Sequence, residues 1–257
     1  LGVVAFFCTV SVRSAASQDY IVWADPRAYK IQRAELDGSN VTDLVTGVTQ
    51  APHSVSVHNK SQMVYWTTLE PNYEPRPIYR TRLDGSFSEQ IISQSVAAIG
   101  MLGINNETDD LYLMTGTGYR WFDYDPRVRK IELRRFGLDG NNPTIINQNV
   151  NSAPDGYNNT ASWYNWAWSG QMAFNLKDNS IYHPFGTGSI GKIERNGSAT
   201  TVVQNAWPSF REWPPDAIAR VIWGLAVDQV NEKIYFANAV NHNIYRADYD
   251  GGNIEWV

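Results

Sequence analysis

The sequence predicts an all-β fold, a β-propeller built from four-stranded antiparallel blades. Three observations predict it. One phrase of strands recurs five times along the 257 residues, a tight-turn dipeptide closes each copy, and no helical pattern separates the copies. A recurring unit of this size is typical of stacked or circular repeat architectures. A circular arrangement is favoured, because an open row of short strands would leave its hydrogen-bonding edges exposed.

Each copy of the phrase holds an apolar strand, a gap, a second strand and a tight turn. The first strands begin at Tyr20, Met63, Asp110, Ser180 and Lys233. The turns are Asp-Gly at 37–38, 84–85, 139–140 and 250–251, and Asn-Gly at 196–197. Glycine supplies the positive φ that a tight strand-to-strand turn needs. Each phrase is therefore expected to form a hairpin.

Two more strands complete each unit. A short apolar strand follows each turn, at 43–45, 90–92, 143–146, 201–203 and 253–257. Another precedes copies two to five, at 53–57, 99–104, 171–174 and 222–227. We name the four strands A to D, with A innermost. In strand C, we expect apolar Ile31 and Ile244 to face inward and the long polar side chains of Arg33 and Arg246 to extend outward.

Some of these residues resemble a known family. Tyr65-Trp66-Thr67-Thr68, the Ile-x-Arg-x-x-Leu-Asp-Gly phrases and the segment 224–228 are similar to the YWTD repeats of low-density lipoprotein receptor class B. The resemblance covers residues 19–257. It implies a six-bladed propeller from a receptor or a matrix protein such as nidogen. Aspartates at the last motif position help to lock neighbouring blades in that family, and here only Asp25 keeps that residue type.

The number of strands predicts about five blades. Strands B, C and D occur five times, whereas strand A occurs four times. We expect a ring of the six-bladed type that is incomplete at the C-terminus of this sequence. The alternative is a five-bladed ring closed by the segment Val3–Val12.

The first residues predict secretion. An apolar stretch, 1–12, is followed by small residues at 14–17, and this order is typical of a signal peptide. The stretch is too short to span a bilayer comfortably. We therefore expect a signal peptide at 1–18, a propeller at 19–257, and a location outside the cell or on its outer surface. The alternative is a buried first strand. The single cysteine, Cys8, lies in this segment, so no disulfide is expected in the mature chain.

Composition and motifs argue against several functions. The net charge of −5 and the absence of basic clusters argue against nucleic-acid binding. The four histidines, His53, His58, His183 and His242, lack metal-ligand spacing. The glycine pattern at 186–191 leads into a strand, which provides no helix N-terminus for a pyrophosphate. No nucleophile motif is present. The positions predicted to line the central channel are mostly apolar, and they are His53-Ser54, Ile99-Gly100, Met172 and Ile222-Trp223. We expect no cofactor, no metal and no enzymatic activity.

Alternating strand direction divides the connections between two faces. The A–B and C–D turns emerge on one face, which we call the turn face, and the B–C and D–A connections on the other, which we call the loop face. Four of the five Asn-x-Ser/Thr sites map to the turn face and one to the loop face. These candidate glycosylation sites are Asn40, Asn59, Asn106 and Asn196, and Asn158 on the loop face.

The loop face carries long insertions that are rich in aromatic residues. Loops commonly carry function, and aromatic anchors with arginine are typical of protein interfaces. Alternatively, these rings pin long loops to the propeller. The candidate partner-binding residues are Tyr73, Tyr119, Trp121, Tyr124, Trp163, Tyr164, Trp166, Trp207, Phe210, Arg211 and Trp213. We predict an extracellular module that binds a protein partner. The alternatives are a carbohydrate-binding propeller and a structural or assembly module of the matrix.

Overall fold

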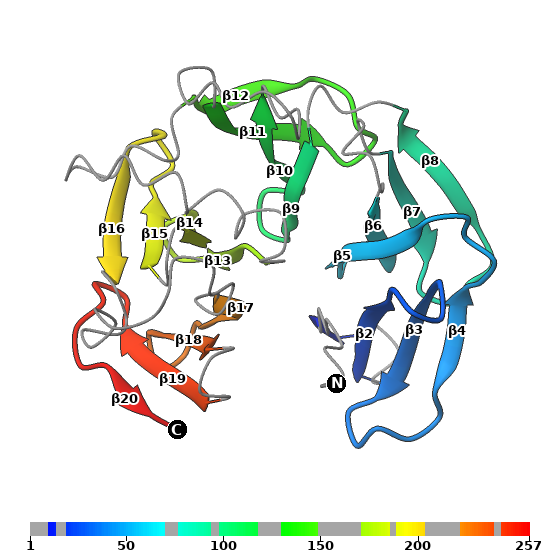
Figure 1. The fold of residues 1–257 in the computed structure, drawn as a ribbon, viewed down its shortest axis with the longest axis horizontal. Helices are drawn as coiled ribbons and strands as arrows, with labels where there is room; N and C mark the ends of the chain where they lie inside the picture. Colours follow the sequence, from blue (N-terminus) through cyan, green and yellow to red (C-terminus); the bar gives the residue numbers. More distant parts are fainter. Residues whose placement is uncertain are drawn as a thin grey trace, which may run out of the picture.

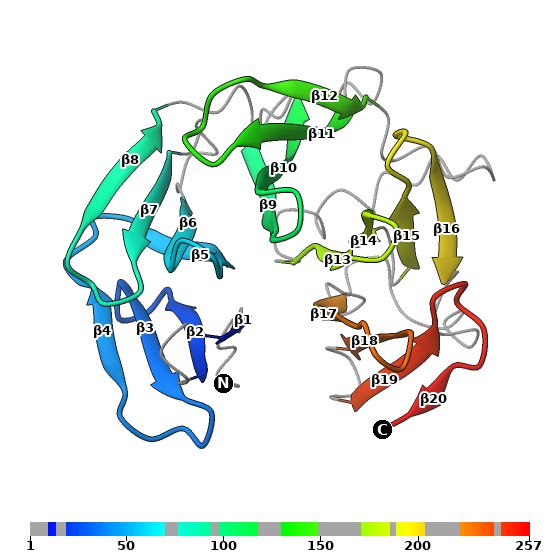
Figure 2. The same cartoon turned by 180° about the vertical axis from the view of Figure 1, so that it is seen from behind.

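The computed structural model shows five four-stranded antiparallel sheets arranged as the blades of a propeller (Figures 1 and 2). It describes residues 10–13, 19–69, 77–93, 98–117, 130–148, 171–185, 189–203, 222–238 and 243–257. The predicted all-β propeller class and its four-stranded blades are therefore confirmed.

Each blade is formed by four consecutive strands, paired in sequence order. Blade 1 contains β1 (Val10–Arg13), β2 (Asp19–Asp25), β3 (Lys30–Glu35) and β4 (Thr42–Val45). Blade 2 contains β5 (Ala51–His58), β6 (Met63–Leu69), β7 (Ile78–Arg82) and β8 (Ser88–Ile92). Blade 3 contains β9 (Ala98–Asn105), β10 (Asp110–Thr117), β11 (Lys130–Gly137) and β12 (Thr144–Asn147). Blade 4 contains β13 (Ala173–Asn175), β14 (Ser180–Phe185), β15 (Ser189–Ile193) and β16 (Ala199–Val203). Blade 5 contains β17 (Ile222–Asp228), β18 (Lys233–Asn238), β19 (Asn243–Asp248) and β20 (Glu255–Trp256).

The first strand of each of blades 2 to 5 lies nearest the centre of the ring (Figure 1). β5 contacts β9, and β13 contacts β17. A parallel bridge between Leu102 and Gln171 joins blade 3 to blade 4. These are the four inner strands that the sequence predicts.

Blade 1 has an inner strand of its own within the segment predicted to be a signal peptide. In β1, Val10 pairs with Val22 of β2, and Arg13 pairs with Asp19. Cleavage after residue 18 would leave blade 1 with three strands. The pairing agrees with the alternative of a first strand, while cleavage itself stays a prediction.

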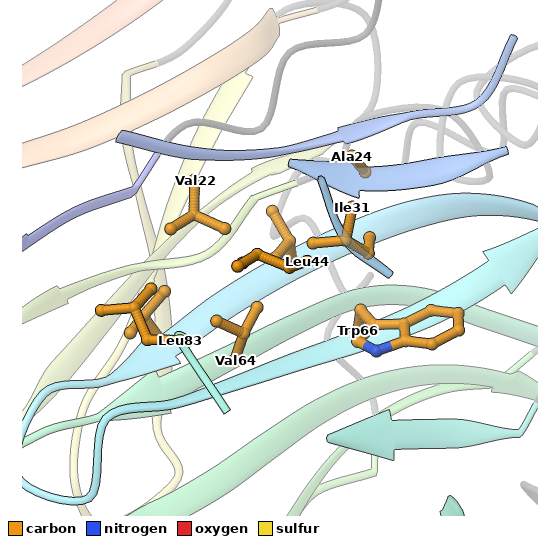
Figure 3. Packing of buried hydrophobic residues seen from close by; sticks show 9 residues of the cluster. Val22, Ala24, Ile31, Leu44, Val64, Trp66 and Leu83 are labelled. Carbon is orange, nitrogen blue, oxygen red and sulfur yellow. The ribbon is translucent and has the colours of Figure 1, made fainter. Parts of the chain in front are cut away.

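The hydrophobic core lies between the blades. The described residues form four buried clusters, and each cluster joins two consecutive blades. Figure 3 shows the first, in which Val22, Ile31 and Leu44 of blade 1 meet Val64 and Trp66 of blade 2. Burying one such side chain contributes about 1.5–3 kcal/mol. Each blade therefore depends on its neighbours for much of its stability.

The five C–D turns share one local structure. Their glycines, Gly38, Gly85, Gly140, Gly197 and Gly251, have φ between 76° and 87°. In each turn the side-chain oxygen of the preceding Asp or Asn accepts a hydrogen bond from the backbone N–H two residues later, as Asp37 does from Ser39 at 2.8 Å. This is the turn chemistry that the sequence predicts for Asp-Gly and Asn-Gly.

Four of these turns also contact the D strand of the preceding blade. In the D strands of blades 1 to 4, one bulged residue is skipped in the pairing with strand C: Leu44, Ile91, Ile146 and Val202. The carbonyl oxygen of this residue faces the turn glycine of the next blade. A Cβ atom would lie 3.2 Å from the Leu44 oxygen at Gly85, and 2.8 Å from the Ile91 oxygen at Gly140. At Gly197 and Gly251 it would overlap the corresponding oxygen. Glycine is therefore required at this contact for two reasons: the turn needs a positive φ, and the approaching carbonyl leaves no room for a side chain.

The prediction that Ile244 faces inward is wrong. Ile244 is 52% exposed, whereas Ile31, Ile78, Leu133 and Ile190, at the same place in their blades, are 0% exposed. Those four are covered by the next blade, and none of the described residues covers blade 5 on that side. Among the described residues, no strand lies between blade 1 and blade 5 (Figures 1 and 2).

The single motif aspartate, Asp25, acts locally. Its Oδ1 atom accepts hydrogen bonds from the backbone N–H groups of Arg27, at 3.0 Å, and Ala28, at 2.9 Å. These bonds close the β2–β3 turn within blade 1. The described hydrogen bonds of Asp25 therefore differ from the contact between blades that the family resemblance implies.

Gly251→Ala is expected to destabilise the protein more than Gly38→Ala. Both glycines have positive φ, which costs alanine about 1 kcal/mol. Only at Gly251 does the added methyl group overlap the Val202 carbonyl, since nothing lies within 4 Å of a Cβ at Gly38. That overlap adds about 1–3 kcal/mol. Urea denaturation of both variants measures the difference, and equal losses would contradict the proposed contact.

Candidate functional site

The predicted partner-binding residues all lie outside the described residues. The strands that flank them are described, and they place every one of these segments at a B–C or D–A connection. Tyr73 lies between β6 and β7, the 119–124 group between β10 and β11, the 163–166 group between β12 and β13, and the 207–213 group between β16 and β17. Because the strands alternate in direction, these connections leave the blades on one face. The attachment points of the loop face are therefore as predicted.

A buried polar group lies where β5 and β6 reach the loop face. Ser54 and Thr67 are fully buried, and Thr67 Oγ1 accepts a hydrogen bond from the Ser54 N–H at 3.4 Å. Thr68 Oγ1 donates to Gln50 Oε1 at 2.8 Å. The pairing of β5 with β6 shifts register between Pro52 and Val55. In this interval the Thr67 hydroxyl accepts the hydrogen bond from the Ser54 N–H.

Sequence reasoning identified part of this group. It placed His53 and Ser54 at the channel end of the inner strand but gave no role to Thr67 or Thr68. The signal available was Thr68, which stands at the last motif position, where the family has Asp. Since the Thr67 and Thr68 hydroxyls bond within blade 2, they stabilise the end of the inner strand beneath the loop face. Ser54 Oγ instead accepts a hydrogen bond from the Leu102 N–H of blade 3 at 3.3 Å.

A second polar group joins blades 2 and 3 on the turn face. His58 is 3% exposed, with its Nδ1 2.7 Å from Ser61 Oγ and its Nε2 3.1 Å from Asp109 Oδ1. Lys60 donates to the same Asp109 oxygen at 2.7 Å. The hydrogen bonds from Lys60 and His58 lower the pKa of Asp109 below its ordinary value. The group ties the A–B turn of blade 2 to that of blade 3.

The four described glycosylation candidates lie on turn-face connections, as predicted, but their surroundings differ. Asn40 and Asn196 are exposed on C–D turns, whereas Asn59 and Asn106 are half-buried on A–B turns. Asn106 Nδ2 donates to the Val57 carbonyl at 3.0 Å, and Asn106 Oδ1 accepts from the Asn59 N–H at 2.6 Å. Asn158 lies outside the described residues. The amide nitrogen of Asn106, to which a glycan would attach, is thus committed to a contact between blades.

His183 is a packing residue. It is 1% exposed and pairs across the sheet with Gly191, where a Cβ atom would contact the imidazole ring. The corresponding cross-strand pairs are Trp66 with Tyr79, stacked at 4.4 Å, and Phe236 with Tyr245, at 5.7 Å. Burial lowers the pKa of His183 from 6.5 to about 4. The strand β15 follows the 186–188 segment, so the glycine pattern leads into a strand, as predicted.

Within the described residues, no group of three or more His, Cys, Asp or Glu side chains is placed to hold a metal ion. Nor does the same part of the chain contain a helix of the length and hydropathy needed to cross a membrane.

Comparison with known proteins supports the fold. No family model matches the chain. A chain in the crystal structure of a nidogen/laminin complex matches with a TM-score of 0.63 at 12% identity, covering 95% of this chain and 76% of the other. A putative TolB from Agrobacterium tumefaciens matches with a TM-score of 0.62 at 12% identity, covering 96% and 79%. A gluconolactonase from Xanthomonas campestris matches with a TM-score of 0.60 at 14% identity, covering 96% and 74%. At these identities the likeness concerns the propeller fold alone.

Asn196 and Asn40 are expected to carry glycans in protein secreted from eukaryotic cells, and Asn106 is expected to carry none. Asn106 is half-buried and its Nδ2 contacts the Val57 carbonyl of blade 2, so a glycan on this nitrogen would have to fit between two blades, whereas Asn40 and Asn196 are exposed. Glycopeptide mass spectrometry of the folded product gives the occupancy of each site. A folded product with Asn106 largely occupied would contradict this expectation.

His183 is expected to make stability fall as the pH drops from about 6.5 to about 4. The unfolded chain binds a proton on this imidazole below pH 6.5, but the folded protein only below about pH 4. Stability from the neutral buried ring is therefore complete above pH 6.5 and is lost towards pH 4, up to about 3 kcal/mol. Urea denaturation at pH 7 and pH 4.5 measures this loss. His183→Phe is expected to reduce the difference between the two pH values, and an unchanged difference would exclude His183 as its source.

Proposed function

We propose that this chain is an extracellular binding module that engages a protein partner through the loop face. The observation that carries the proposal is topological. The connections that hold the eleven candidate residues all leave the blades on one face, and they include six of the ten tryptophans. Aromatic side chains concentrated on one face are typical of interface anchors, since they bury a large area at a small cost in entropy.

Features of the turn face support the proposal that the loop face binds the partner. Its C–D turns are short, and exposed Asn-x-Ser/Thr sites lie on two of them, at Asn40 and Asn196. Glycans there would leave the loop face free for a partner, and they agree with the proposed location outside the cell. The nidogen/laminin match is also a propeller crystallised with a partner, whereas the gluconolactonase match is an enzyme on the same fold. Fold alone does not decide between these, so the proposal that the chain binds rather than catalyses rests on the loop face.

Alanine at Trp121, Trp163 and Trp213, singly and together, tests the proposal. We expect each single change to weaken binding about tenfold or more, because an interface anchor contributes 2 kcal/mol or more. Binding is measured by biolayer interferometry against a panel of purified matrix proteins that includes laminin. Phe87→Ala is the matched control, since Phe87 is 42% exposed on the turn face.

Three outcomes are distinguishable. Loss of binding in the tryptophan variants with normal binding by Phe87→Ala supports the proposal. Equal binding by all variants, or loss in Phe87→Ala alone, overturns it. Binding to a glycan array without binding to any protein of the panel would favour the carbohydrate-binding alternative.

A further inference from the structure

Three polar side chains on the turn face form a chain of hydrogen bonds from a hydroxyl to a carboxylate. Ser61 Oγ lies 2.7 Å from His58 Nδ1, and His58 Nε2 lies 3.1 Å from Asp109 Oδ1. Ser61 is exposed, whereas His58 is buried. A serine, an imidazole and a carboxylate bonded in this order form the arrangement that activates a serine as a nucleophile.

The carboxylate of Asp109 determines which nitrogen of His58 carries the hydrogen. Hydrogen bonds from Lys60 and His58 lower the pKa of Asp109, so this group is ionised at neutral pH and can only accept hydrogen bonds. His58 Nε2 must therefore be the donor in its contact with Asp109. In the neutral imidazole Nδ1 then carries no hydrogen and accepts from the Ser61 hydroxyl. The serine hydrogen is thus already directed at a base.

The A–B turns of blades 2 to 5 share one backbone form, which allows them to be compared. The fourth residue of each turn has a φ between 55° and 59°, and these residues are Gln62, Asp109, Asn179 and Glu232. In blade 3, Asn105 Oδ1 accepts from the N–H groups of Glu107, at 2.9 Å, and Thr108, at 3.3 Å. Asp228 of blade 5 accepts from the same two positions of its own turn. These two N–H groups therefore bind a side-chain oxygen.

The turn of blade 2 lacks this oxygen, because His58 stands at the place of Asn105 and Asp228. Its Nδ1 bonds to the Ser61 hydroxyl instead. Among the described residues, the backbone N–H groups of Lys60 and Ser61 have no acceptor. They are available to an oxygen from outside the protein. Two backbone donors beside a nucleophile are what stabilises the oxyanion of an acyl-transfer reaction.

We propose that Ser61 is a nucleophile that takes the acyl group of an activated ester, with His58 as its base and Asp109 as the residue that positions the base. Ser61 Oγ bonds to the ester carbonyl carbon while its proton passes to His58 Nδ1. The carbonyl oxygen gains negative charge and is held by the N–H groups of Lys60 and Ser61. The ester C–O bond then breaks, and the leaving alcohol takes the proton from His58. The products are an acyl-serine and a free alcohol.

The surroundings of the site suit a small ester. The hydroxyl of Ser61 is on an exposed turn, and the side chain of Asp109 is 48% exposed, so the ester can approach from solvent. Lys60 Nζ donates to Asp109 at 2.7 Å, which keeps this amine protonated and a poor competitor for the acyl group. The site lies on the turn face and is independent of partner binding by the loop face. Because Asp109 lies 51 positions after His58, no sequence motif joins the two.

Acetylation by p-nitrophenyl acetate tests the proposal on the whole chain, produced in bacteria so that no glycan on Asn59 lies beside Ser61. Peptide mass spectrometry over a time course gives the rate at each serine. Ser39 and Ser198 are internal references, since they are exposed on C–D turns and their hydroxyls bond to oxygen acceptors rather than to an imidazole. We expect Ser61 to be acetylated about a hundredfold faster than either reference, which is the lower end of what a positioned base contributes.

Two substitutions test the roles of the base and of the carboxylate. In Asp109→Asn the amide can donate to His58 Nε2, so that Nδ1 keeps the hydrogen and no longer accepts from Ser61. His58→Asn places in blade 2 the residue type that caps the turn of blade 3, so the turn is expected to keep its form while losing its base. Each substitution is expected to lower the rate at Ser61 about a hundredfold and to leave the rates at Ser39 and Ser198 unchanged.

Thr108→Ser is the matched control, because position 108 takes the place of Ser61 in blade 3, and Asn105 there takes the place of His58. We expect position 108 to be acetylated no faster than the reference serines. A rate at Ser61 equal to the reference rates, or unchanged by both substitutions, would overturn the proposal and leave the three side chains as a structural tie between blades. An acetyl group found on Lys60 and absent from Ser61 would overturn it as well.

Discussion

The whole ring depends on the contact between consecutive blades. In blades 1 to 4, a bulged residue near the end of the D strand turns its carbonyl towards the next blade, and a glycine at positive φ in the C–D turn of that blade allows the carbonyl to approach. The buried clusters form on the inner side of the same contact, from aliphatic and aromatic side chains of both blades. Since a single four-stranded sheet has two faces and little interior, an isolated blade would leave most of these side chains in water.

This arrangement makes the blades interdependent, as in other repeat proteins whose stability is the sum of unit and interface contributions. Polar contacts also join consecutive blades at several places in the ring. Asn106 joins blades 2 and 3 at their A–B turns, and Gln229 joins blades 4 and 5 through the Phe174 carbonyl and the Leu176 N–H. The blades at the two ends each have one neighbour among the described residues.

The same topology separates rigid and variable parts of the molecule. Turns of a few residues with capped geometry close the turn face, whereas the B–C and D–A connections accept insertions of differing length on the loop face. Buried hydroxyls such as Thr67 and Thr68 complete the strand ends beneath those insertions. A rigid scaffold with long loops on one face suits recognition, because loop sequence varies without disturbing the contacts between blades. This is the physical basis of the proposed binding function.

The sequence by itself determined the repeat, the four strands of each unit, the five Asp-Gly or Asn-Gly turns and the face on which each connection emerges. These features follow from local rules, namely the alternation of apolar residues and the φ that glycine allows. The tertiary structure decided which repeated residues are buried. Ile31 and Ile244 have the same local pattern, yet a following blade covers only the first. Asn196 and Asn106 share one short motif, yet the backbone of a neighbouring blade engages only the second. Burial and hydrogen bonding between blades depend on residues about fifty positions away, and no local pattern records them.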